Sequence, residues 1–167
     1  HMPVCRIRMH QVHLQKPDGS YDFSLYDAAF DEAQRNGVKI YATVFPAGVA
    51  ADVGGFKFPE TDAHWKAVGK FIQQLVTHYK DHPALAAWVL LNEPGVGGIV
   101  PNTPFSQQKL KEWQAKQPAP ITYNGYTRHS FDQDRFLREY TTWYLGWIAA
   151  EIRKYDGKSQ LHVNNHM

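Results

Sequence analysis

Cysteine, long apolar runs and net charge are all scarce in this sequence, and each shortage excludes a class of protein. Cys5 is the one cysteine among 167 residues, so no disulfide can form within the chain, and we expect its side chain to be buried as a small hydrophobic group. No stretch approaches the roughly 18 apolar residues of a membrane-spanning helix. The formal charge is +2 at pH 7 and the Lys and Arg residues are scattered, so we expect neither a membrane nor a nucleic acid as a partner.

Patterns for metals and cofactors are missing as well. Nine histidines are present, but no Cys/His cluster has the spacing of zinc ligands. A doubly wound nucleotide-binding sheet, the competing architecture, normally has a glycine-rich phosphate loop after its first strand. The first predicted strand instead continues into Arg8 and His10, and the glycines at 95–98 lack the Lys-Ser/Thr ending of a P-loop. We therefore expect no metal ion, and the sequence lacks the phosphate loop of a nucleotide-binding sheet.

What the sequence does contain is a regular alternation of short apolar runs and amphipathic segments. The runs favour strands covered on both faces, and the segments repeat apolar residues every three to four positions, as helices do. In the first helix the buried face is predicted to begin at Leu25 and to continue through Ala33. The order β-α-β-α-β-α-β indicates a parallel sheet with helical crossovers. Strands are predicted at 4–9, 38–44, 86–91 and 161–165, and long helices at 24–36, 62–80 and 132–155.

Several residues predict where these helices begin and end. Ser24, with Asp27 three residues later, has the spacing of a capping box. Gly37 follows the first helix at the position that favours a left-handed backbone. Thr61 or Asp62 is expected to cap the second helix, so that each helix fits between two predicted strands.

The chain is long enough for one domain with a core, but shorter than the roughly 250 residues of a complete eight-fold βα barrel. No linker or change of composition divides it, so we treat 1–167 as a single unit. Residues 95–131 form an extended insertion after the third strand, with a short helix predicted at 106–115. Trp113 in this insertion is a candidate platform for a sugar ring, because apolar sugar faces stack on aromatic rings; core packing is the alternative.

Asn92-Glu93-Pro94 follows directly on the third apolar run. In a βα barrel the catalytic groups lie at the carboxyl ends of the strands. A glutamate there, with an amide residue before it, suits a general acid that protonates a leaving oxygen. The alternative is an acidic residue that starts a helix after a turn set by Pro94.

His10 and Asn165 occupy the ends of the first and last predicted strands. Both side chains offer hydrogen-bond donors and acceptors, which sugar hydroxyls require. We therefore include them as candidate substrate-binding residues, with the capping of a loop or turn as the alternative for each.

Three segments together resemble the clan A glycoside hydrolases, retaining enzymes built on a (β/α)8 barrel, and within that clan families 42 and 5. The resemblance covers most of the chain outside the insertion and corresponds to the second to fifth βα units. It implies an α/β fold of the TIM-barrel type with about half of the barrel present. The segments are VCRI at 4–7, GSYDFS at 19–24 with GVKI at 37–40, and HYKDHPAL at 78–85 with Trp88 and Asn92-Glu93-Pro94.

This resemblance implies the hydrolysis of β-glycosidic bonds in an oligosaccharide or polysaccharide, with retention and without a cofactor. Glu93 would be the general acid/base, and Asn92 would hydrogen-bond the sugar 2-hydroxyl. Arg6 would lie beneath the catalytic nucleophile and keep that carboxylate ionised. Such substrates favour a secreted or periplasmic location, although no signal peptide is visible at the N-terminus.

One part of this mechanism is missing from the predicted elements. The nucleophile of the clan is a glutamate at the end of the seventh strand, and the resemblance stops at the fifth. Retention needs two carboxyl groups about 5–5.5 Å apart. Of the other glutamates, Glu60, after a glycine-rich segment, is the least implausible replacement for the nucleophile. We therefore expect this chain alone to be inactive.

Two alternatives stay open. The first is that the chain is a non-catalytic carbohydrate-binding or half-barrel interaction module, which applies if the rest of the barrel does not exist. In either case a half-barrel has two exposed strand edges, so we expect self-association or pairing with the missing half of the barrel. A different barrel enzyme, with Glu93 as a base acting on a phosphorylated metabolite, is the second alternative.

Overall fold

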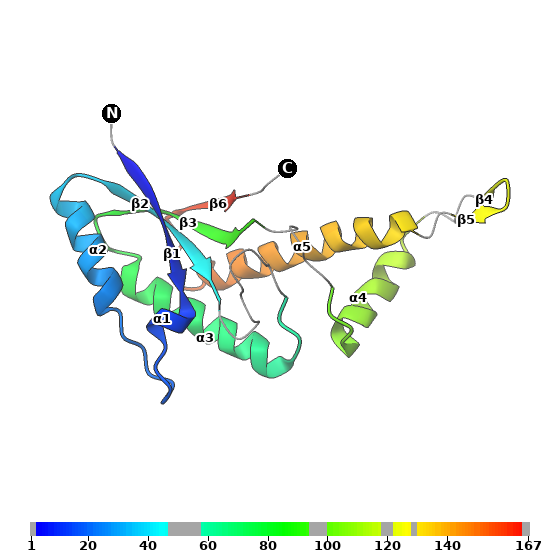
Figure 1. The fold of residues 1–167 in the computed structure, drawn as a ribbon, viewed down its shortest axis with the longest axis horizontal. Helices are drawn as coiled ribbons and strands as arrows, with labels where there is room; N and C mark the ends of the chain where they lie inside the picture. Colours follow the sequence, from blue (N-terminus) through cyan, green and yellow to red (C-terminus); the bar gives the residue numbers. More distant parts are fainter. Residues whose placement is uncertain (1–2, 47–57, 94–99, 118–121, 128–129, 165–167) are drawn as a thin grey trace.

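A computed structural model of the chain describes residues 3–46, 58–93, 100–117, 122–127 and 130–164 (Figure 1). Four strands form one sheet in which every neighbouring pair is parallel. Each of these strands lies beside the one that precedes it in the βα alternation, which is the arrangement of a βα barrel. In their order across the sheet they are β1 (Val4–His10), β2 (Lys39–Phe45), β3 (Leu85–Asn92) and β6 (Gln160–Asn164).

Three long helices connect these strands and lie on one side of the sheet (Figure 1). They are α2 (Ser24–Arg35), α3 (Asp62–Tyr79) and α5 (Ser130–Arg153). The predicted alternation is therefore confirmed, and the observed bounds differ from the predicted ones by two residues at most.

Two elements are not predicted from the sequence: α1 (Gln11–Leu14) and the hairpin of β4 (Thr122–Tyr123) and β5 (Tyr126–Thr127). The hairpin turns at Asn124 and Gly125, whose φ angles of 50° and 78° are both positive. Asn-Gly is the pair that a two-residue hairpin turn favours, because both of its central residues need a positive φ.

The short helix predicted in the insertion is present as α4 (Pro104–Gln114). It begins with a reciprocal capping box, in which the Thr103 side chain accepts from the Ser106 N–H and the Ser106 hydroxyl accepts from the Thr103 N–H. Together with the hairpin, α4 extends beyond the sheet (Figure 1).

The start of α2 differs from the prediction. The capping position is Phe23 rather than Ser24, and the Asp22 carboxylate accepts the Ser24 N–H at 3.0 Å. Asp27 makes no capping box; it accepts a hydrogen bond from the Tyr79 hydroxyl of α3 at 2.8 Å. Asp27 therefore forms a contact between α2 and α3 instead of the cap at the start of α2 that its spacing from Ser24 predicts.

Two other helix ends are as predicted. Gly37 has a φ of 66°, in the left-handed region that a residue with a Cβ rarely adopts. Thr61 caps α3, since its hydroxyl oxygen accepts from the His64 N–H at 3.2 Å. These two signals are local, which explains why the sequence alone sufficed to predict them.

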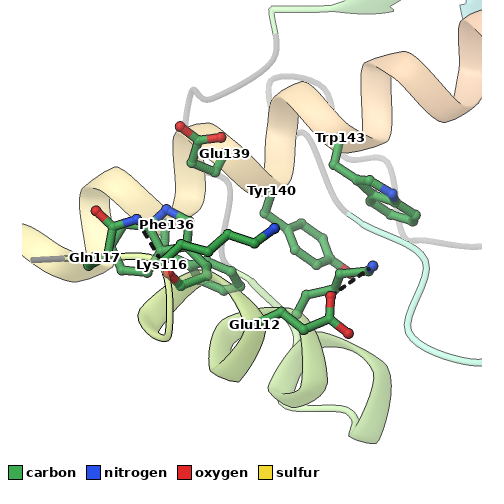
Figure 2. A pocket seen from close by; sticks show the side chains of 9 residues that line it. Glu112, Lys116, Gln117, Phe136, Glu139, Tyr140 and Trp143 are labelled. Atoms are coloured by element: carbon green, nitrogen blue, oxygen red, sulfur yellow. Dashed lines mark hydrogen bonds and ion pairs between the residues drawn. The ribbon is translucent and has the colours of Figure 1, made fainter.

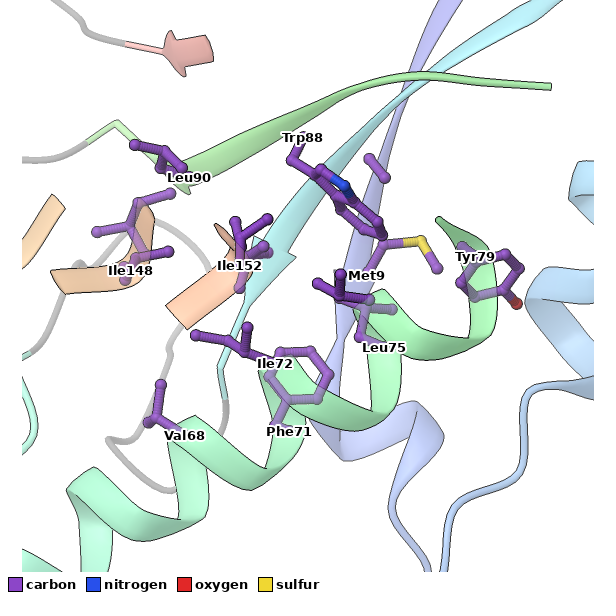
Figure 3. Close-up of a cluster of buried hydrophobic side chains, with 14 of the residues drawn as sticks. Met9, Val68, Phe71, Ile72, Leu75, Tyr79, Trp88, Leu90, Ile148 and Ile152 are labelled. Carbon is purple, nitrogen blue, oxygen red and sulfur yellow. The ribbon is translucent and has the colours of Figure 1, made fainter. Parts of the chain in front are cut away.

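The core lies between the sheet and the long helices, with β3 at its centre. Leu90 of β3 points toward Ile148 of α5, and Trp88 of β3 points toward Met9 of β1 and Leu75 of α3 (Figure 3). A fully buried apolar side chain of this size contributes roughly 1.5–3 kcal/mol. The stripe that α3 buries against this layer follows the helical period: Val68, Phe71, Ile72, Leu75, Val76 and Tyr79.

The opposite face of the sheet is polar at its first edge. Met9 and the half-buried Cys5 of β1 pack toward the helices, so the strand alternation places Arg6 and Arg8 on the opposite face, where both are exposed. The prediction that all strands are apolar on both faces is wrong for β1. The prediction of a fully buried Cys5 is wrong as well, because β1 is an edge strand in the described sheet and has a neighbour on one side only.

The middle of that face is covered by two rings. Tyr41 of β2 and His162 of β6 meet across β3, with 4.9 Å between their ring centroids. Beneath them lie the register partners Ala87 and Val89, which are 0% and 2% exposed. Small side chains on β3 leave room for the two rings, so β3 is buried on both faces.

A buried hydrogen bond fixes the last turn of the fold to β3. The Asp156 side chain, only 2% exposed, accepts the indole N–H of Trp88 at 2.9 Å and the backbone N–H groups of Lys158 and Ser159, each at 3.0 Å. Burial by itself raises the pKa of Asp156, but the hydrogen bonds from Ser159, Trp88 and Lys158 outweigh burial and lower this pKa from 3.8 to about 2.

Replacing Asp156 by Asn should lower the free energy of unfolding by about 2 kcal/mol at neutral pH, the equivalent of this pKa difference. Because the folded-state pKa is lowered, the contribution is present above pH 3.8 and is lost as the pH falls toward 2. Urea denaturation of the parent and Asp156→Asn between about pH 2 and 7 measures it.

The exposed Glu139 of α5 provides the control, since Glu139→Gln should change stability by less than about 0.5 kcal/mol. The same acid dependence in the parent and in Asp156→Asn would contradict the assigned role.

Candidate active site at the carboxyl ends of the strands

The carboxyl ends of the parallel strands lie along one edge of the sheet. His10 at the end of β1 is the register partner of Phe45 at the end of β2, and Asn92 of β3 is paired with Asn164 of β6. Neighbouring strands are about 4.8 Å apart, so the ends of β1 and β3 are roughly 10 Å apart. Residues far apart in the sequence are thus gathered within the span of a small ligand.

Glu93 follows β3 directly, is half-buried, and has a left-handed backbone with a φ of 48°. Among the described residues one other non-glycine residue, Asn124, has a positive φ, and its hairpin turn explains it. No hairpin accounts for Glu93. A non-glycine residue in this region costs roughly 1–3 kcal/mol, and such strain concentrates at functional sites.

A compact aromatic cluster surrounds His10. Its imidazole ring lies 4.2 Å from the Phe45 ring and 5.0 Å from the His13 ring, centroid to centroid. The backbone N–H of His10 donates to the Tyr26 hydroxyl at 3.1 Å, and this hydroxyl donates to the backbone carbonyl of Arg8 at 3.0 Å. Tyr26 thus links helix α2 to the end of β1 by two hydrogen bonds.

The electrostatics of this cluster favour a neutral imidazole. Burial, then the neighbouring His13 and Arg8, lower the pKa of His10 below 6.5. A neutral imidazole has one donor and one acceptor nitrogen, the combination that a hydroxyl group of a ligand can use on either side.

Tyr26 is a site residue that is not predicted from the sequence. The predicted buried face of α2 begins at Leu25, which is 64% exposed, whereas Tyr26 is 6% exposed. The buried positions are Tyr26, Phe30 and Ala33, so the prediction is confirmed for Ala33 at the end of the face and is wrong for Leu25 at its start. The spacing of these three residues is itself helical and was the available signal.

Arg6 lies lower on the same face as His10. It is four residues earlier in β1, roughly 13 Å along the strand, and its register partner is Tyr41. Its side chain is exposed. Arg6 therefore lies near the middle of β1 on this sheet face, below the strand ends where His10 and Glu93 lie.

The remaining sequence candidates lie elsewhere. Asn165 is outside the described residues. Trp113 is on α4, in a pocket between α4 and α5 whose lining includes neither Asn92 nor Glu93 (Figure 2). The structure thus brings Asn92, Glu93, His10 and, below them, Arg6 to one sheet, and it does not bring Trp113 to this group.

Glu93 is the one glutamate of the described residues that follows a strand end. Glu60 precedes α3 and is exposed, and its backbone N–H donates to His64 at 3.3 Å. Glu32 and Glu151 belong to long helices, where they pair with Arg35 and Lys154. Glu112 pairs with Lys109 on α4, and Glu139 is exposed on α5.

Two other kinds of site are absent from the described ranges. No helix there has both the length and the apolar character required to cross a membrane. No group of three or more His, Cys, Asp and Glu side chains there is arranged to hold a metal ion.

Removing the His13 ring should raise the pKa of His10, because one of the charges that disfavour the imidazolium is then absent. Burial remains, so in His13→Ala we expect the pKa of His10 to rise and still lie below 6.5. NMR titration of the imidazole signals measures both values. His64→Ala, at the start of α3, should leave His10 unchanged, and titration of His10 above 6.5 in the parent would contradict the burial argument.

Comparisons with known proteins agree with this geometry at the level of the fold. No family model and no curated protein sequence matches the chain. Among solved structures, the β-galactosidase of Bacillus circulans sp. alkalophilus matches with a TM-score of 0.72 at 15% identity, over 96% of this chain and 32% of that one. A family 42 β-galactosidase of G. stearothermophilus gives 0.70 at 17% identity, over 97% and 31%. A xylanase of Cellvibrio japonicus, in complex with xylopentaose, gives 0.53 at 15%, over 96% and 28%.

At these identities the likeness is evidence for the fold alone. The chain spans about a third of the length of the solved structures it matches. The predicted fold class is confirmed: parallel strands alternate with helices as in a TIM barrel, and the chain holds only a part of such a barrel. The chain therefore has the fold of part of a (β/α)8 barrel, like the β-galactosidases and the xylanase that it matches.

Proposed function

We propose that the chain forms the second to fifth βα units of a retaining β-glycosidase, with Glu93 as the general acid/base. The observation that carries the proposal is the position of Glu93, held in a left-handed backbone directly after the buried strand β3. The fold of the β-galactosidases and the xylanase that the chain matches supports it.

In this proposal Glu93 protonates the glycosidic oxygen as the bond breaks, and it later accepts a proton from the attacking water. Asn92 hydrogen-bonds the sugar 2-hydroxyl. The neutral His10 and Asn165, which follows β6 in the sequence, contact other hydroxyls. The chemistry needs no cofactor, because both proton transfers and the covalent intermediate are handled by carboxyl groups.

The nucleophile comes from outside the described strands. It must lie about 5–5.5 Å from the acid/base, and no second glutamate of the described residues follows a strand end. Arg6, on the same face of the sheet as His10, would stabilise the ionised nucleophile of a closed barrel. The substrate class is a β-galactoside, or a β-linked glucan or mannan.

Glu93→Ala in the full-length protein should slow the hydrolysis of glycosides with poor leaving groups by about 10²–10⁴-fold. Glycosides of activated phenols should be affected far less in bond cleavage, because their leaving groups need little protonation. Added azide should then trap the glycosyl-enzyme as a β-glycosyl azide. Steady-state rates on both substrate types and product analysis by NMR test this.

Glu60→Ala is the matched control, since it removes an exposed glutamate at the start of α3 and should leave both rates unchanged. Equal losses for both substrate types in Glu93→Ala would exclude Glu93 as the acid/base. If Glu60→Ala instead removes activity, the second carboxyl group lies within this chain.

A second candidate function is non-catalytic sugar binding or barrel pairing by this chain. The observation in its favour is the lack of a second strand-end glutamate among the described residues. The two candidates differ in one measurable way: a binding module retains its full function in Glu93→Gln, whereas a glycosidase loses turnover.

The open sheet also leads to a prediction about association. β1 and β6 are edge strands of the described sheet, and unpaired edges favour pairing with another chain. We expect the isolated 167-residue chain to self-associate, or to bind the rest of the barrel when this is supplied. Light scattering at micromolar concentration measures the mass, and a stable 19.1 kDa monomer would contradict the expectation.

A further inference from the structure

A pocket of about 320 Å³ lies between α4 and the first half of α5, apart from the strand ends (Figure 2). This volume is at the lower end of the range for small-molecule sites. Both helices contribute side chains, so the pocket depends on the packing of α4 against α5. Its lining residues are Lys109, Glu112, Trp113, Lys116 and Gln117 on the α4 side, and Phe136, Glu139, Tyr140 and Trp143 on α5.

The apolar part of the lining is aromatic. The Trp113 and Phe136 rings are 5.7 Å apart and tilted by 52°, and Tyr140 lies between Phe136 and Trp143 at 5.8 Å and 5.6 Å. The guanidinium of Arg135 lies 5.7 Å from the Trp113 ring centre. Flat rings of this kind offer a surface on which the apolar face of a sugar ring stacks.

The charged part of the lining is balanced. Lys109 and Glu112 pair with each other at 3.2 Å, and Lys116 and Glu139 supply one further charge of each sign. A balanced set of donors and acceptors disfavours a ligand with a strong charge of either sign. It suits a neutral ligand with many hydroxyl groups, which can donate to the carboxylates and accept from the ammonium groups.

The Tyr140 hydroxyl is the second, independent observation. The residue is 2% exposed, and its hydroxyl is buried and has no hydrogen-bond partner among the described residues. Burial raises its pKa to about 12, so the hydroxyl stays protonated at neutral pH. A buried hydroxyl without a partner costs roughly 1–3 kcal/mol. A ligand oxygen would offset this cost once a small shift of the Tyr140 side chain opens its hydroxyl to the pocket.

We propose that this pocket binds a pyranose unit of a β-linked saccharide, as a binding site separate from Glu93. The Trp113 ring would stack on the apolar face of the sugar, while Lys116, Glu139 and the Tyr140 hydroxyl hydrogen-bond its hydroxyl groups. The choice of a β-linked saccharide rests on the proposed function; the aromatic and neutral character of the ligand does not.

The test is a titration of the full chain carrying Glu93→Gln, which prevents turnover, with β-1,4-galactobiose. The indole N–H signals of Trp113 and Trp143 in a ¹H–¹⁵N NMR spectrum report on the pocket, whereas Trp88, hydrogen-bonded to Asp156 in the core, reports on the integrity of the fold. We expect the pocket signals to shift with a Kd on the order of 1 mM, or about −4 kcal/mol. The Trp88 signal should not move.

Trp113→Ala should weaken this binding at least tenfold, and Tyr140→Phe, which removes only the hydroxyl, by several-fold. Trp147→Phe is the matched control: Trp147 packs against Trp65 with 4.8 Å between ring centroids and is not in the pocket lining, so affinity should be unchanged. Trp113→Phe keeps a ring and should bind with intermediate affinity, which separates stacking from a folding defect.

Unchanged Trp113 and Trp143 signals at about 20 mM galactobiose would overturn the proposal, as would equal affinity in the parent, Trp113→Ala and Tyr140→Phe. The proposed function fails separately. Trp113-dependent binding in a protein whose full-length form shows no glycosidase activity would remove the catalytic role of Glu93 and leave the pocket as assigned.

Discussion

Strand β3 is buried on both of its faces, and its position determines where Glu93 lies. On one face Trp88 and Leu90 pack against the helices, and on the other the rings of Tyr41 and His162 meet over Ala87 and Val89. A strand held between two packed layers cannot slip by one residue, because every side chain would then move to the wrong face. The end of β3, and with it the backbone of Glu93, is therefore fixed by side chains earlier in the strand.

This fixation explains how the chain tolerates an unfavourable backbone at its candidate catalytic residue. A left-handed glutamate costs roughly 1–3 kcal/mol, and one buried apolar side chain of β3 contributes about as much. The hydrogen bond from Trp88 to Asp156 adds a polar anchor that links β3 to the turn before β6. Strain at the end of the strand is thus balanced by packing in its middle, where no catalytic demand limits the choice of residue.

The sequence predicts those parts of the fold that depend on local patterns. The alternation of strands and helices, the left-handed Gly37 and the Thr61 cap all follow from neighbouring residues. The errors occur where a contact between distant segments decides. Asp27 leaves its expected capping role for the Tyr79 hydroxyl of α3, and Tyr26 rather than Leu25 turns inward because its hydroxyl joins the end of β1.

The candidate site shows the same division. The motif around Glu93 and the position of His10 could be found from the sequence, since each follows an apolar run. The exposed Arg8, the neutral state of His10 and the separation of Trp113 from the strand ends required the sheet and its register. A sequence identifies which residues follow strands, but the distance between them depends on which strands pair.

One helix connects the core to the pocket beside α4. Ile148 and Ile152 of α5 are buried against β3, and Phe136 and Tyr140 of the same helix line the pocket. An α-helix rises 1.5 Å per residue, so Tyr140 and Ile152 are about 18 Å apart along a continuous element. The aromatic wall on α5 is therefore held in place by the packing of the core, although it lies beyond the sheet. A ligand that enters this pocket meets side chains that are already ordered, which lowers the entropy cost of binding.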